Sequence, residues 1–362
     1  MTKQPFSLQF GRSAAALFVP FALLGLLAGD PAAASPTVRI GPQVVMSRQG
    51  APTTSECRTL LGVPCYGPQQ IRTAYGVNSL IYGGWAGFGQ TIVLIESFGS
   101  PTLEADLKQF DADFGLPDPP SLAVLAPLGA VPFDPTNQDM IIWALETTLD
   151  VEWAHAMAPG ANIVVLTSPV AETVGVQGLP EFLALETYAL DLHLGTIISQ
   201  SWLTAENTLF TPQGLDVIAG FSALYERARD EHVTVLASAG DTGSANLAPD
   251  GTFYPFPTVG FPASSPLVTA VGGTSLSIND WGIYLSETVW NDSAGAGGGG
   301  VSQVFQTPDY QKQWLSPNAQ TALAGYRGIP DVSFNADPIN SAILIYISAG
   351  ASAGSHFRDI HG

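Results

Sequence analysis

The chain has 362 residues, of which 46% are apolar and only 12% are charged. This composition excludes an intrinsically disordered protein, because disorder requires low hydrophobicity together with high charge density. Acidic residues outnumber basic ones 31 to 12, which gives a formal net charge of -19. Nucleic acids and anionic membrane surfaces are bound through basic patches, so the sequence argues against either as a partner.

The chain begins with a segment typical of secretory signal peptides. Basic residues up to Arg12 precede the apolar run Ala14–Gly29, and the small residues Ala32–Ala34 follow it. This order predicts a signal peptide over residues 1–34, and therefore a secreted, extracellular protein. A membrane anchor is the alternative, but Pro20 interrupts the run, which is shorter than the roughly 20 residues that a span requires.

The two cysteines, Cys57 and Cys65, lie close together in the text ECRTLLGVPCYG. In an exported protein such a pair predicts a local disulfide that closes a short loop. A zinc site would require further Cys or His residues at ligand spacing, and the neighbouring sequence has none. We assign residues 35–64 to an N-terminal segment with this loop, and residues 65–362 to the main domain.

Short β-branched runs then alternate with amphipathic stretches. The predicted strands, in chain order, are Thr91–Ile95, Ser121–Leu125, Asn162–Thr167, Thr196–Gln200, Val233–Ala237, Leu267–Val271 and Ala342–Ile347. The predicted helices are Leu103–Phe114, Met140–Ala156, Pro180–His193 and Gly214–Arg229. This alternation predicts an α/β fold with a mostly parallel sheet flanked by helices on both faces. Functional residues of such folds gather at the carboxyl ends of the strands.

After about residue 285 the sequence becomes rich in Gly, Ser and Asn, as in SAGAGGGGVS. Apolar strand text resumes afterwards, which is not expected of a linker between domains. We therefore predict that this stretch forms loops around a site.

Glu146 and Asp150 lie four residues apart on the predicted helix Met140–Ala156, so both project from one face. That face also carries apolar residues, and carboxylates in such surroundings repel each other and lose hydration. The pKa of one of them should then rise, so that the two share a proton. The alternative is a solvated acidic face, which we assign instead to Thr147, Thr148 and Glu152. The pair is thus a candidate functional site.

Three further residues follow predicted strands. Asp241 stands in VLASAGDTGS, Glu96 comes after TIVLI, and Trp202 comes after TIISQ and one serine. An acid at the carboxyl end of a parallel strand is well placed for a site. The alternative for Asp241 is a structural role, because Asp is a favoured turn residue. No GxGxxG, P-loop or HExxH spacing occurs, so nucleotide and zinc binding have little support.

Six segments together carry a family resemblance. They are CYGPQQIRTAYGV, ALETTLDVEWAHAMAPGANIVVL, ASAGDTG, FPASSPLVTAVGGTSL, GGGVSQVFQTPDYQKQW and RGIPDVSFNADP. In this order they resemble the sedolisin family, secreted serine-carboxyl peptidases with a subtilisin-like fold. The resemblance runs from Cys65 to Pro338. It implies a doubly wound α/β domain that hydrolyses peptide bonds through an acyl-enzyme.

The resemblance also implies roles for the acidic residues. Glu146 would be the general base for a nucleophilic serine, with Asp150 hydrogen-bonded behind it. Asp241 would be protonated and would donate to the developing oxyanion. Glu96 and Trp202 would have supporting positions. Both the carboxylate base and the protonated donor require acid, so the activity is expected at low pH.

The family's nucleophilic serine lies in a Gly-Thr-Ser turn after the PDVS segment. Here the Gly-Thr-Ser that ends at Ser275 precedes PDVS, where the family has a strand, so Ser275 is not expected to be catalytic. The remaining candidate is Ser352. The family implies calcium, but only Asp359 of the calcium loop is present, so the site is not complete in this chain. We interpret the peptidase domain as truncated at its C-terminal end and expect feeble cleavage.

Three functions remain open. The first is a sedolisin-type endopeptidase, expected to be a monomer, that acts on peptide or protein substrates. The second is an inactive secreted relative that binds peptides or protein partners on the same scaffold.

The third is a glycoside hydrolase with Glu146 and Asp150 as its acid pair. Two acids on one helix do not easily face each other across a scissile bond. This function would also require a sugar-binding groove lined by tryptophans, namely Trp143, Trp153 and Trp202.

Overall fold

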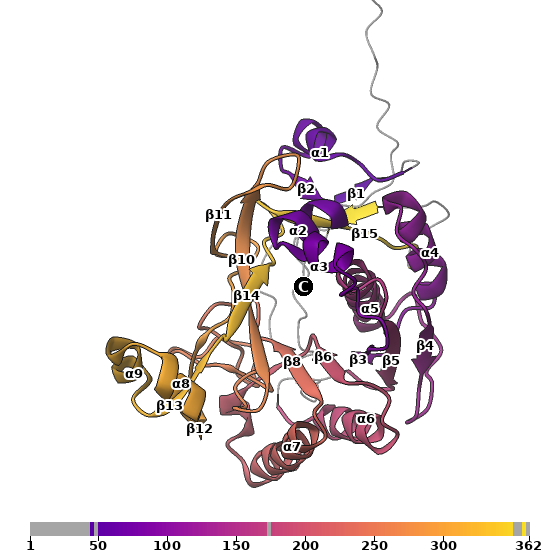
Figure 1. Ribbon diagram of the computed structural model, residues 1–362. Helices are drawn as coiled ribbons and strands as arrows, with labels where there is room; N and C mark the ends of the chain where they lie inside the picture. Colours follow the sequence, from indigo (N-terminus) through magenta and orange to yellow (C-terminus); the bar gives the residue numbers. More distant parts are fainter. Residues whose placement is uncertain (1–43, 47–49, 172–174, 350–356, 360–362) are drawn as a thin grey trace, which may run out of the picture. The chain divides into compact units, whose positions relative to one another are not determined.

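The computed structural model describes residues 44–46, 50–171, 175–349 and 357–359, the first and last of these by their backbone only. All of them belong to one compact unit, Ala33–Gly362. The predicted signal peptide and the candidate Ser352 lie outside the described residues, as does the side chain of Asp359. Figure 1 shows how the elements of this unit are arranged.

An eight-stranded sheet forms the centre of the unit. Its strands are β3 (Thr91–Ser97), β4 (Leu122–Leu125), β5 (Asn162–Ser168), β6 (Ile197–Gln200), β8 (Thr234–Ser238), β10 (Thr269–Ile278), β11 (Tyr284–Val289) and β14 (Val332–Asn335). They follow the order β11–β10–β8–β6–β3–β5–β4, and β14 pairs with β10 outside this path. Neighbouring strands run parallel, and the antiparallel pair within this described sheet is β10 with β11. The expected mostly parallel sheet is confirmed.

Strand β3 lies where the direction of winding reverses. From β3 the chain passes to the edge at β4 and returns to β5, and it then crosses to β6, β8 and β10 on the other side of β3. Crevices for ligands open at such a switch point, beyond the carboxyl ends of the strands. Glu96 lies at this end of β3.

Four long helices cover the two faces of the sheet (Figure 1). They are α4 (Leu103–Phe114), α5 (Gln138–Met157), α6 (Leu179–Asp191) and α7 (Pro212–Asp230). Val93 and Ile95 of β3 pack in the core of α6 and α7, whereas Leu94 between them packs in the core of α4 and α5. Because side chains alternate along a strand, a strand covered on both faces reads as a continuous apolar run.

The predicted helices and strands are all present, and most of their ends lie within a few residues of the predicted ones. Helix α5 begins at Gln138 because the Asn137 side chain accepts hydrogen bonds from the backbone N–H of Asp139 at 2.9 Å and of Met140 at 3.3 Å. Strand β10 continues to Ile278, well past the predicted end, because its second half pairs with β11. Strand β11 was not among the predicted strands.

A buried acid lies under the sheet between α6 and α7. Glu186 of α6 is fully buried, and burial raises its pKa well above the ordinary value. The hydroxyl of Tyr225 on α7 is its neighbour and lowers that pKa in part. A carboxyl in these surroundings is held in its neutral form.

Smaller elements complete the unit. A four-stranded sheet has the order β1–β16–β15–β2, built from β1 (Val44–Met46), β2 (Cys65–Tyr66), β15 (Ala342–Tyr346) and β16 (Phe357–Asp359). The others are α1 (Thr54–Leu61), α2 (Pro68–Ala74), α3 (Val77–Tyr82), β7 (Thr204–Ala205), the 3-10 turn η1 (Glu206–Leu209), β9 (Gly260–Phe261), β12 (Gly300–Gln306), α8 (Asp309–Trp314), α9 (Pro317–Leu323) and β13 (Tyr326–Ile329). Within the described residues, no helix combines the length and the apolar character needed to span a bilayer.

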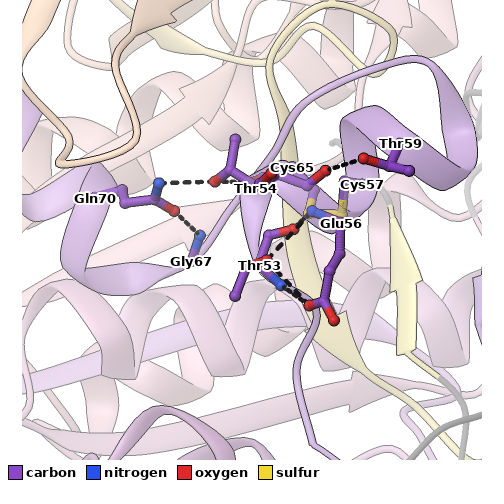
Figure 2. The surroundings of a disulfide bond; sticks show 9 residues. Thr53, Thr54, Glu56, Cys57, Thr59, Cys65, Gly67 and Gln70 are labelled. Carbon is purple, nitrogen blue, oxygen red and sulfur yellow. Dashed lines mark hydrogen bonds between the residues drawn. A yellow bond between two sulfur atoms is a disulfide. The ribbon is translucent and has the colours of Figure 1, made fainter.

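The predicted disulfide between Cys57 and Cys65 is present and joins α1 to β2 (Figure 2). Thr54 Oγ1 donates to the carbonyl oxygen of Cys65 at 2.8 Å and accepts from Gln70 Nε2 at 2.8 Å. Strand β2 pairs in parallel with β15, so that Cys65 lies opposite Ala342. The disulfide therefore fastens the N-terminal segment to a strand that comes nearly 280 residues later in the chain.

Replacing Cys57 and Cys65 together by alanine is expected to lower the free energy of unfolding by roughly 2–3 kcal/mol, because the short loop opens in the unfolded chain. Urea denaturation under oxidising conditions measures the change. The control is Thr59→Ala on the exposed side of α1, whose hydroxyl bonds only its own helix at 2.8 Å. Equal transition midpoints for the double variant and this control would contradict the prediction.

Candidate active site

Helix α5 carries the predicted acid pair and packs against β3, α4 and β15. Thr147, Thr148 and Glu152 are fully buried, so the expectation that they form a solvated face is wrong. Their partners come from the protein instead of water: Thr148 Oγ1 donates to the Ala144 carbonyl at 2.7 Å, and Glu152 Oε2 accepts from the Tyr346 N–H at 2.9 Å. A helix enclosed by neighbours has no solvated face to display.

Glu146 and Asp150 are both withdrawn from solvent, as expected. Glu146 is buried, with 5% of its surface exposed, and Asp150 is partly buried. Asp150 Oδ2 accepts a hydrogen bond from Ser201 Oγ at 2.7 Å. Burial raises the pKa of Asp150, while the hydroxyl of Ser201 and the carboxyl of Glu96 oppose this by favouring its charged form.

Glu96 joins the pair and makes a cluster of three carboxyls. Its side chain is fully buried, and Oε2 accepts from Thr147 Oγ1 at 3.4 Å. Burial, followed by the charges of Asp150 and Glu146, raises the pKa of Glu96 well above its ordinary value. The interaction with Asp150 raises the pKa of Glu96 and lowers that of Asp150, so the proton of this pair resides on Glu96.

Strand register places these groups together. Gln200 at the end of β6 lies opposite Ile95 of β3, so the next residues, Ser201 after β6 and Glu96 on β3, lie side by side. Leu94 packs on the α4 and α5 side, and Glu96, two residues later, points to the same side. There it meets Asp150, one of the α5 acids.

Asp241 occupies the turn after β8. Gly240 before it has φ +106°, a left-handed conformation that favours glycine. Asp241 is partly buried, and desolvation raises its pKa to about 6. Asp241 is therefore protonated over most of the acid range, in which an ordinary Asp would be ionised.

The glycine-rich stretch lies against the Asp241 turn, which agrees with the prediction of loops there. The N–H of Ala296 donates to the carbonyl of Asp241 at 2.9 Å, and the N–H of Gly298 donates to that of Gly240 at 2.6 Å. A Cβ atom added at Gly298 would lie 2.0 Å from the carbonyl oxygen of Ala239. Only glycine allows the two backbones this approach.

A cavity of about 450 Å³ lies on the α5 side of the sheet. Asp150, Ser201 and Asp241 line it. Most of the remaining wall is apolar and includes Ile92, Leu94, Trp153, Ile197, Leu236, Val271, Phe334 and Ile343. The cavity thus brings a carboxylate, a hydroxyl and a protonated carboxyl to one space, which is an arrangement suited to acid–base chemistry.

The three tryptophans do not form a groove. Trp143 and Trp202 are buried in the core beneath α6 and α7, where Trp202 stacks on Phe182 with ring centroids 4.6 Å apart. Trp153 lines the cavity, but its Nε1 donates to the Leu344 carbonyl at 3.0 Å. These three side chains therefore do not provide the tryptophan-lined groove that a glycoside hydrolase would require.

Among the serines, Ser275 lies on β10, where it hydrogen-bonds Asp337. Ser201 is the serine that the sequence analysis missed, although it lies between two residues that were considered, Gln200 and Trp202. Its position could have indicated a role, because Ser201 lies at the carboxyl end of β6 just as Glu96 lies at the carboxyl end of β3.

The described residues do not supply the calcium site that the family resemblance implies. In this part of the chain no three His, Cys, Asp or Glu side chains are grouped as a metal ion would require. Calcium takes about six oxygen ligands, and carboxylates usually provide several of them.

Known proteins resemble this chain in sequence and in fold. Kumamolisin from Bacillus sp. (strain MN-32) is 36% identical over 298 residues, which are 80% of this chain and 50% of the relative. The solved structure of Pseudomonas sedolisin, described as a serine-carboxyl proteinase, superposes with a TM-score of 0.62 and 26% identity, over 78% of this chain and 73% of that one. The chain belongs to the sedolisin family. Its fold is the subtilisin-like α/β fold of that structure.

Other relatives of this sedolisin-family chain match over shorter parts. Tripeptidyl-peptidase 1 from Rattus norvegicus is 31% identical over 230 residues, which are 58% of this chain and 37% of the relative. The chain thus spans half or less of the length of the curated relatives that it matches. No family model matches the sequence.

Proposed function

We propose that this chain is an acid-acting serine-type endopeptidase of the sedolisin kind. The observation that carries the proposal is the cavity, on whose wall Asp150, backed by Glu96, lies with a second acid, Asp241, held protonated by burial. Family membership supports it, because one relative is named a tripeptidyl-peptidase and the solved structure is described as a serine-carboxyl proteinase.

In the proposed reaction a serine Oγ attacks the peptide carbonyl carbon while its proton passes to Glu146. Asp150 stabilises the proton-bearing base through its own negative charge, and Asp241 donates its proton in a hydrogen bond to the tetrahedral oxyanion. Collapse breaks the C–N bond, and the leaving amine takes the proton from Glu146. Water then attacks the acyl-enzyme carbonyl carbon in the same way, and collapse releases the new carboxyl product and the free serine. Ser352, outside the described residues, is the candidate nucleophile.

Glu96 and Trp202 have supporting roles in this proposal. Glu96 holds the proton that would otherwise neutralise Asp150. Trp202 fills the core directly after β6, where its ring stacks on Phe182 and supports the strand end that presents Ser201. Neither side chain lines the cavity wall.

The proposal includes the organisation of the chain. Residues 1–34 are a signal peptide that directs secretion, residues 35–64 are an N-terminal segment held by the disulfide, and residues 65–362 are the peptidase domain. The substrates are peptides or proteins, and the chain acts as a monomer without nucleic-acid or membrane partners. The strongly acidic composition supports the last point, because both of those partners attract basic surfaces.

The pH dependence of peptide cleavage tests the proposal. Asp241 can donate only while protonated, so cleavage by the full chain is expected to fall about tenfold per pH unit above about pH 6. In Asp241→Asn the amide keeps a donor and cannot ionise, so the decline near pH 6 should disappear even if the rate is lower. A decline that is unchanged in Asp241→Asn would contradict the role of Asp241.

The second function, an inactive relative that binds peptides, is separated by the same samples. Absence of cleavage at every pH, together with saturable binding of a fluorescent unstructured peptide, would favour it over the peptidase. The mostly apolar wall of the cavity is the observation that supports such binding.

A further inference from the structure

Ser201 makes a short polar contact to Asp150, the member of the acid cluster that lines the cavity. Its Oγ lies 2.7 Å from Asp150 Oδ2, although the two residues are 51 positions apart in the chain. Ser199 and Ser238 line the same cavity, and neither makes a hydrogen bond to an acid among the described residues. A hydroxyl has one proton to donate, and a carboxylate can only accept, so the proton of this contact belongs to Ser201.

The surroundings of Asp150 otherwise disfavour its charge. Glu96 on β3, Glu146 on the same helix and Asp241 across the cavity are all acidic, and no Lys, Arg or His lines the cavity in the described part of the chain. An ionised Asp150 therefore depends on hydrogen bonds for its stability. Two groups provide them: Glu96, which is itself an acid that can lose its proton, and Ser201, which cannot ionise in this range.

We propose that Ser201 is a positioning residue for Asp150: its hydroxyl fixes the direction of the carboxylate and keeps the negative charge there while Glu96 holds the proton. The role rests on the proposed function, in which Asp150 stands behind the base. Without the hydroxyl, Asp150 loses the donor that does not depend on pH. The proton would then move from Glu96 toward Asp150, and the base would lose the charge behind it.

The test compares an isosteric pair of variants. Aspartate labelled with 13C at the side-chain carboxyl is incorporated into the full chain, and its signals are followed by NMR between about pH 3 and 8. The Asp150 signal is identified by its absence in Asp150→Asn. Ser201→Val, which has the shape of Ser201→Thr but lacks the hydroxyl, is expected to raise the Asp150 titration midpoint by about one pH unit. Ser201→Thr, which keeps the hydroxyl, restores it.

Ser199→Ala is the matched control, because Ser199 lies on β6 two residues before Ser201 and lines the same cavity wall. It should leave the Asp150 midpoint unchanged. An unchanged midpoint in Ser201→Val, or an equal rise in Ser199→Ala, overturns the proposal. If Ser201→Val does not fold, the unmodified chain still decides: with glutamate carboxyls labelled in the same way, Asp150 must titrate below Glu96, and the reverse order overturns the proposal.

This measurement does not depend on catalysis. A chain that cleaves no peptide but shows the expected shift supports the role of Ser201 and removes the proposed peptidase. A chain that cleaves peptides but whose Asp150 midpoint is unchanged in Ser201→Val supports the proposed peptidase and overturns the role of Ser201.

Discussion

Glu146→Gln is expected to lower kcat/KM for peptide cleavage in acid by about 10²- to 10⁴-fold, because an amide keeps the shape of the base but cannot accept a proton. The loss should appear in kcat more than in KM, since proton transfer occurs in the transition state. Steady-state kinetics on an unstructured peptide at several acidic pH values provide the measurement.

The matched control is Glu152→Gln on the same helix. Glu152 is also buried, but its carboxyl accepts from the Tyr346 N–H at 2.9 Å, and its acidic neighbours are Asp106, Asp111 and Asp113 instead of Glu96 and Asp150. An amide oxygen can accept that bond equally well, so kcat/KM should change little. Similar losses in both variants would mean that Glu146 acts through the stability of α5 and is not the base. Ser352→Ala, assayed beside them, tests the nucleophile separately.

Asp331→Ala is expected to lower the free energy of unfolding by about 3–5 kcal/mol, because it leaves a buried guanidinium without its counter-charge. Arg327 is fully buried, and its two terminal nitrogens donate to the Asp331 carboxylate at 2.8 and 2.5 Å. The same carboxylate accepts from the Ala270 N–H of β10 at 2.9 Å and from the Tyr310 hydroxyl of α8 at 2.9 Å. One carboxylate thus joins three elements.

Urea denaturation near pH 6 measures this loss. Asp309→Ala is the control, because it removes a carboxylate from the exposed pair with Lys312 on α8, and it should have no measurable effect. Adding Arg327→Met to Asp331→Ala should recover part of the lost stability, since the unpaired charge is then removed. A double variant no more stable than Asp331→Ala would show that the charge is not the cause.

The fold was predictable from the sequence because its strands are buried on both faces. TIVLI reads as one apolar run, and in the structure Val93 and Ile95 enter one core while Leu94 enters the other. The same logic located Glu96 and Asp241, since residues that follow parallel strands gather at one edge of the sheet. These inferences needed only the local sequence and a general rule for parallel sheets.

The errors have the opposite origin, since they concern contacts between distant segments. Thr147 and Glu152 were assigned to solvent because both are polar, but their partners lie on β3 and β15. Ser201 was missed because its importance depends on Asp150, on another element. Composition and periodicity describe how one element meets an average environment, and they do not identify the particular atom that a polar side chain will meet.

The buried acids Glu96, Glu152 and Glu186 give the fold a chemical dependence on its medium. Burial raises the pKa of each well above the ordinary value, so the folded chain retains protons that the unfolded chain releases above about pH 4–5. Folding above that pH therefore takes up protons from water, and the stability falls as the pH rises from there toward the pKa values of the folded state. In acid the protons are already in place. Protons are thus ligands of the folded protein, bound at three buried carboxyls that lie far apart in the sequence.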